Sequence, residues 1–60
     1  MDTKEYYDLL LEYDIATEQE INLVVNINGW SNDTLDSIVY ARTGYQDFEQ
    51  YYKCELINNY

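Results

Sequence analysis

Apolar residues recur at helical spacing in four stretches of the chain, with short turns between them. In the first stretch, from Asp2 to Tyr13, an apolar set lies at i, i+3, i+4 and i+7: Tyr6, Leu9, Leu10 and Tyr13. Acidic residues recur on another side of the same stretch: Asp2, Glu5, Asp8 and Glu12. We therefore expect a first helix with one face toward a core and an acidic stripe outward.

The second stretch opens with residues that favour a helix start. Thr17 and Glu20 have the spacing of a capping box, in which each side chain satisfies a backbone N–H of the other residue. The β-branched residues from Ile21 to Ile27 raise the strand propensity. The cap nevertheless favours a helix, and Gly29 is expected to end it in the left-handed conformation.

Two more helices are predicted after this turn. Ser31 is a suitable N-cap for the third helix, and Gly44 a suitable stop. The fourth helix is expected from about Gln46 to Leu56, with one face made of Phe48, Tyr51, Tyr52 and Leu56. The sequence thus predicts a single all-α domain over residues 1–60, a compact bundle of three to four short helices. A three-helix version, with the last segment frayed, is the nearest alternative.

The second and third helices are joined by a turn that resembles the centre of a helix-turn-helix motif. The match is imperfect, because Asn28 stands where an apolar residue is usual. The third helix is expected to point Asp33, Asp36, Ser37 and Tyr40 outward. Two carboxylates on a recognition helix would repel phosphates. A small DNA-binding transcriptional regulator is therefore kept only as the alternative function.

The charge balance narrows the classes of partner. Twelve Asp and Glu stand against three Lys and Arg, giving a formal net charge of −9. Such a surface repels nucleic acids and anionic lipids and attracts basic protein surfaces. We expect a protein with a basic surface as partner, no nucleic acid and no membrane. No apolar run is long enough to span a membrane, the N-terminus does not resemble a signal peptide, and a cytoplasmic location is expected.

Few residues offer catalytic or metal-binding chemistry. The chain has no His and one Cys, and it has no calcium-loop motif. Cys54 is expected to be a half-buried apolar residue. A bundle of this size leaves little room for a deep pocket. We expect no enzymatic activity, no cofactor and no metal.

Eight tyrosines in sixty residues are the least ordinary feature of the composition. Four are expected in the core, with their hydroxyls near the surface: Tyr6, Tyr13, Tyr51 and Tyr52. Four others are harder to bury and suit an interface, or a homodimer: Tyr7, Tyr40, Tyr45 and Tyr60. Combining acids with an exposed tyrosine, we predict a protein-binding set: Asp8, Glu12, Asp33, Asp36 and Tyr40.

Three runs of the sequence carry a resemblance to a known group of proteins: Ile27-Asn28-Gly29-Trp30, residues 34–45 and Asp47-Phe48-Glu49-Gln50-Tyr51. With these runs the chain resembles short acidic proteins of phages and other mobile elements of Gram-positive bacteria, over about Ile15 to Tyr51. The resemblance implies no activity, site or cofactor. It implies a setting in which small accessory proteins bind host or defence proteins. An acidic inhibitor that docks on a nucleic-acid-binding protein, by mimicking DNA phosphates, fits that setting.

Overall fold

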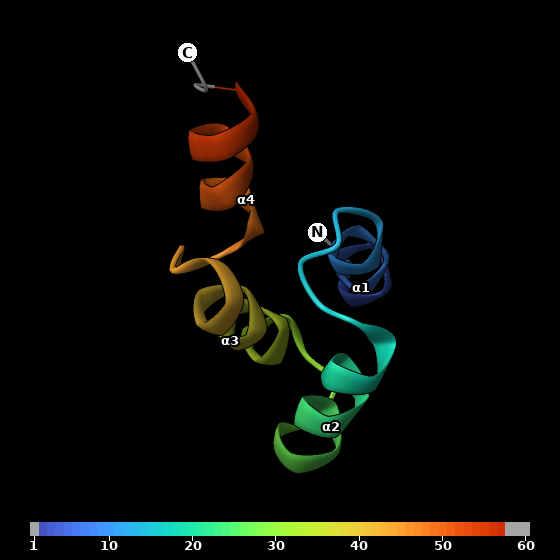
Figure 1. The fold of residues 1–60 in the computed structure, drawn as a ribbon. Coiled ribbons are helices and arrows are strands. Elements are labelled where there is room, and N and C mark those ends of the chain that lie inside the picture. The colour runs from blue at the N-terminus through green and yellow to red at the C-terminus, as the bar shows by residue number, and fades with distance from the viewer. Residues whose placement is uncertain (1, 58–60) are drawn as a thin grey trace.

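A computed structural model of the chain describes residues 2–57 (Figure 1). All of the regular secondary structure in this range is helical. The elements are α1 (Thr3–Glu12), α2 (Glu18–Asn28), α3 (Asn32–Thr43), α4 (Phe48–Tyr51) and the π-helix η1 (Tyr52–Ile57), which continues α4. The predicted all-α class is confirmed. No helix within residues 2–57 is both long and apolar enough to cross a membrane.

Each α-helix begins at a residue whose side chain accepts a backbone hydrogen bond from its first turn: Asp2, Thr17, Ser31 and Asp47. The predicted capping box of Thr17 and the predicted cap at Ser31 are confirmed. Asp47 would lie inside a last helix that began at about Gln46, as expected from the sequence, but it is the N-cap, with its carboxylate 2.8 Å from the Gln50 nitrogen. The last helix therefore begins at Phe48 rather than Gln46.

The chain reverses at residues with positive φ. Gly44 ends α3, as predicted, and it takes the left-handed conformation, with φ 85° and ψ −3°. Gly29 also has a positive φ, 100°, but its ψ is 166°, so the expected left-handed conformation is wrong there. That backbone region is open almost only to glycine, and it sends the chain abruptly away from α2.

The core is built from the first three helices. The fully buried large side chains are Leu10 from α1, Ile21 from α2, and Leu35 and Val39 from α3. Helix α3 is central, since α1 and α2 each pack against it. Helix α4 also packs against α3 and contributes one buried residue, Phe48.

The tyrosines predicted for the core gather around Phe48. Its ring centroid lies 5.3 Å from that of Tyr13 and within 6.5 Å of three others: Tyr6, Tyr51 and Tyr52. Only Tyr6 is buried, whereas Tyr13 and Tyr52 are 37% and 38% exposed. The core prediction is wrong for these two rings, because they cover the open side of Phe48 rather than filling the interior.

The segment η1 departs furthest from the predicted helix among the described residues. A π-helix closes i→i+5 hydrogen bonds, so the face that an α-helix would continue is shifted. Consequently Leu56, predicted on the inner face, is exposed, and so is Cys54, which was expected to be half-buried.

Candidate protein-binding surface

The three cationic side chains of the protein are each held by a different carboxylate. Lys4 pairs with Asp8 at 2.9 Å, and Lys53 pairs with Glu49 at 2.9 Å, both one helical turn apart. Hydrogen bonds to these carboxylates raise the pKa of both lysines. Arg42 pairs with Glu20 at 2.8 Å. The cations therefore form separate local pairs rather than one basic patch.

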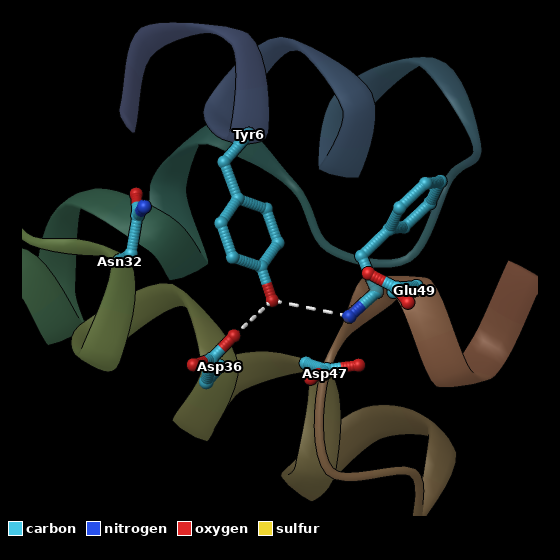
Figure 2. A pocket seen from close by; sticks show the side chains of 6 residues that line it. Tyr6, Asn32, Asp36, Asp47 and Glu49 are labelled. Carbon is cyan, nitrogen blue, oxygen red and sulfur yellow. Dashed lines mark hydrogen bonds between the residues drawn. The ribbon is translucent and has the colours of Figure 1, made fainter. Parts of the chain in front are cut away.

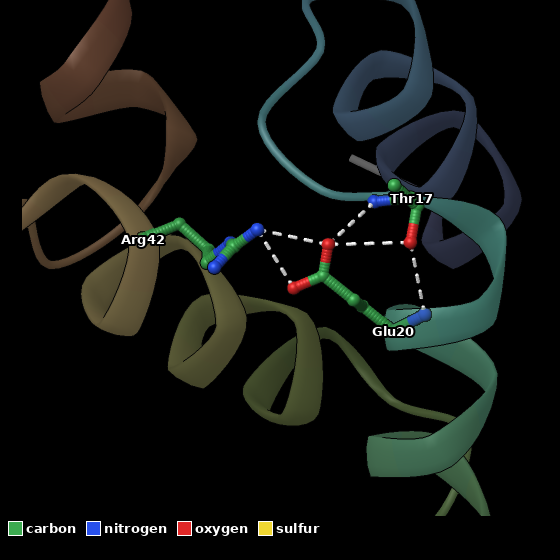
Figure 3. A network of polar contacts seen from close by, with 3 residues as sticks. All are labelled: Thr17, Glu20 and Arg42. Carbon is green, nitrogen blue, oxygen red and sulfur yellow. Dashed lines mark hydrogen bonds and ion pairs between the residues drawn. The ribbon is translucent and has the colours of Figure 1, made fainter.

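The pair of Arg42 and Glu20 is structural (Figure 3). The Glu20 carboxylate accepts from the Thr17 backbone N–H at 3.3 Å, and the Glu20 N–H donates to the Thr17 hydroxyl at 3.2 Å. The same carboxylate accepts from Arg42 of α3. Glu20 thus caps the N-terminus of α2 and links that helix to α3 through its ion pair with Arg42.

Each of the three cations is bound by one carboxylate, so most of the acidic side chains within residues 2–57 have no cationic partner. Nine of the twelve acidic side chains have no Lys or Arg within ion-pair distance in the part of the chain that the structure describes. Such unpaired carboxylates set a negative potential around the molecule, which would draw basic partners toward it.

Three of the five predicted binding residues lie on one face of α3. Helical spacing places Asp33, Asp36 and Tyr40 within a narrow sector of that helix. Tyr40 is 63% exposed, and Asp33 is exposed. Asp36 and Tyr40, with Ser37 and Gln46, line an open hollow of about 290 Å³.

Asp36 was expected to point outward into solvent, and this expectation is wrong in part. It is half-buried, and its carboxylate accepts a hydrogen bond from the Tyr6 hydroxyl of α1 (Figure 2). The same hydroxyl accepts from the Phe48 backbone N–H at 3.2 Å. Burial, and next the hydrogen bond to Asp36, raise the pKa of Tyr6 above its usual range. Asp36 therefore helps to join α1, α3 and α4, as well as bordering the surface.

The structure adds acidic residues to this region that the sequence reasoning did not select. Asp47 and Glu49 line, with Asp36 and Tyr6, a cavity of about 140 Å³ at the junction of α1, α3 and α4 (Figure 2). The sequence offered one signal for Asp47, its spacing to Gln50 as a helix cap. Nothing in the sequence placed it beside Asp36, eleven positions earlier, because Gly44 and the following turn bring the two together.

The other two predicted residues belong to a different surface. Asp8 and Glu12 lie four residues apart on α1, roughly opposite to Tyr6 by helical spacing. Asp8 is already paired with Lys4, and Glu12 is exposed. The predicted set is therefore divided between an outer face of α1 and the α3 face.

Of the tyrosines predicted for an interface, Tyr40 alone is exposed among those described. Tyr7 is half-buried against Trp30, with ring centroids 5.6 Å apart. Tyr45 is half-buried, and its hydroxyl donates to Glu55 at 2.9 Å. Tyr60 lies outside the described residues.

Within residues 2–57, no group of three or more His, Cys, Asp or Glu side chains is arranged to hold a metal ion. No protein-family model matches the chain, and neither does any curated protein or solved structure.

Proposed function

We propose that the protein is a non-enzymatic binding module that docks its acidic α3 face on a basic protein surface. The observation that carries the proposal is the internal pairing of all three cations, which leaves nine carboxylates without a Lys or Arg partner among the described residues. We name Asp33, Asp36, Asp47 and Tyr40 the α3 acidic face. Its charges would steer a basic partner, and the exposed Tyr40 ring would supply apolar contact.

The resemblance to mobile-element proteins suggests the kind of partner. A nucleic-acid-binding protein of the host, or of its defence systems, has the basic surface that such a face would occupy. Carboxylates in place of phosphates would then block that site, and the protein would act as an inhibitor. This would take place in the cytoplasm.

The alternative, a DNA-binding regulator that uses α3, needs the same face to approach phosphates. The exposed Asp33 and the half-buried Asp36 oppose that approach, and Arg42 is held by Glu20. We therefore favour a protein partner over DNA.

The test is to identify a partner by affinity capture from a Gram-positive lysate and to measure its binding by titration calorimetry. Asp33→Asn and Tyr40→Ala should each weaken binding about tenfold, and salt should weaken binding of the wild type. Asp14→Asn is the matched control. It removes one exposed charge at a position where φ is 57°, a conformation that Asn tolerates.

Equal weakening by Asp14→Asn would mean that only overall charge matters, and would contradict the assigned face. Binding of duplex DNA that weakens steeply with salt would favour the regulator instead.

A further inference from the structure

Helix α2 has a second apolar face that the fold leaves uncovered. Ile21 and Val25 turn toward the core, whereas Leu23 and Ile27 are 64% and 80% exposed. By helical spacing, Leu23 and Ile27 lie on the outer side of the helix, and Val24, which is half-buried and packs against the core, borders them. We call these three residues the α2 stripe.

The stripe borders a groove between α2 and α3. Val24 lines this groove with Ile38 and Ala41 of α3, and its volume is about 430 Å³. The charged side chains at its edge are Glu20 and Arg42, which neutralise each other at 2.8 Å (Figure 3). The groove and the stripe together form an apolar surface without an unbalanced charge.

The same region is the longest uncharged segment of the chain. From Ile21 to Asn32 there are twelve consecutive residues without Asp, Glu, Lys or Arg, in a protein of net charge −9. A basic partner would gain nothing from charge here. Two copies of an acidic protein, by contrast, repel each other least where neither carries charge.

We propose that the α2 stripe is a self-association surface, on which a second copy of the chain packs its own α2 stripe about a two-fold axis. A two-fold contact brings the same patch of both copies together, so an apolar stripe meets an apolar stripe. A stable interface covers roughly 800 Å² per partner, about a fifth of the 4195 Å² surface of this chain. One helix face and its groove offer less, so the dimer should be reversible and depend on concentration.

Sedimentation equilibrium from about 10 μM to about 1 mM protein tests the proposal. The wild type should form a dimer whose affinity rises between about 50 mM and 500 mM NaCl, because salt screens repulsion between the two acidic copies. Binding to a basic protein should change in the opposite direction with salt. The proposed self-association and the proposed binding of a basic protein can therefore be tested, and can fail, independently of each other.

Ile27→Asp should weaken dimerisation about tenfold or more, since it places a charge in the apolar contact. Ile27→Gln removes the apolar surface without adding charge, keeps a good helix former, and should also weaken the dimer. Leu56→Asp is the control, because it adds the same charge at an exposed leucine of η1. The segment of α4 and η1 lies at the opposite end of the molecule from α2 (Figure 1). Circular dichroism shows whether each variant stays folded.

A wild type that remains monomeric over the whole range at both salt concentrations overturns the proposal. So does an Ile27→Asp variant that is folded and dimerises like the wild type. A loss of dimerisation in Leu56→Asp equal to that in Ile27→Asp also overturns it, since the effect would then come from net charge.

Discussion

The first three helices and the C-terminal segment are stabilised in different ways. Helices α1, α2 and α3 share a core in which four large side chains are fully buried. Helix α4 and η1 bury one side chain, Phe48, and otherwise extend away from the core (Figure 1). The contrast indicates that the C-terminal segment depends on the three-helix part, whereas the three-helix part has a core of its own.

The connection between the two regions is narrow. Phe48 packs among the tyrosine rings, and its backbone N–H donates to the Tyr6 hydroxyl. That hydroxyl in turn donates to Asp36 of α3. The Tyr6 hydroxyl thus hydrogen-bonds both to the central helix of the core and to the first residue of α4, directly after Asp47. Part of the α3 acidic face depends on this link.

The largest effect is expected from a change in the three-helix core. Leu35→Ala removes a fully buried side chain from the central helix and should cost about 2–5 kcal/mol in free energy of unfolding. A domain of this length has roughly 3–9 kcal/mol in total, so the variant should be largely unfolded at moderate temperature. Thermal unfolding followed by circular dichroism measures the loss.

Leu56→Ala is the matched control for that experiment, since it makes the same change at an exposed leucine of η1. Its free energy of unfolding should stay within about 0.5 kcal/mol of the wild type. Similar losses in both variants would show that the two regions are equally important to stability.

A smaller and more local effect is expected from Phe48→Ala. Removing a buried phenylalanine lowers the free energy of unfolding by about 3–5 kcal/mol when the whole structure unfolds as one unit. Here the C-terminal segment can detach from the core instead, so the three-helix part should lose less stability. Amide hydrogen exchange by NMR should show lost protection in residues 48–57 and retained protection in α2 and α3. Equal loss of protection in both regions would mean that they unfold as one unit.

The smallest of the three effects is expected from Tyr6→Phe. It keeps the ring but leaves the buried Phe48 N–H without its acceptor, at a cost of about 1–3 kcal/mol. In the folded protein the pKa of Tyr6 is raised above its ordinary value of 10.0, by burial and then by Asp36. The stability from Tyr6 is therefore fully present below about pH 10 and is lost as the pH rises further.

Urea unfolding at a series of pH values tests this prediction. Above about pH 10 the stability of the wild type should fall more steeply than that of Tyr6→Phe, which lacks the ionisable hydroxyl. If the unfolding free energies of the two proteins fell in parallel with pH, ionisation of the Tyr6 hydroxyl would not contribute to the pH dependence of stability.

Much of the local structure was predictable because it depends on neighbouring residues. The capping box of Thr17 and Glu20, the cap at Ser31 and the helix stop at Gly44 involve residues within a few positions of one another. The apolar spacing of α1 likewise placed Tyr6 and Leu10, which are both buried, on the inward face. Such features follow from backbone hydrogen bonding and helical geometry, which a sequence states directly.

The candidate surface was less predictable, because it depends on contacts between distant residues. Helical spacing put Asp33, Asp36 and Tyr40 on one face, but it could not show that Tyr6 binds Asp36 or that Asp47 lies nearby. The α2 stripe shows the same limit. An apolar pattern on both sides of α2 does not say which side the neighbouring helices cover.

The sequence by itself determined the helical class, the caps at Thr17 and Ser31, the large negative charge and the uncharged segment from 21 to 32. The tertiary structure decided which carboxylate binds Arg42, which tyrosines cover Phe48 and which face of α2 stays exposed. The physical reason is that caps and periodicity arise within a few residues of backbone. Burial and ion pairing between helices arise only once packing against α3 has fixed their relative positions.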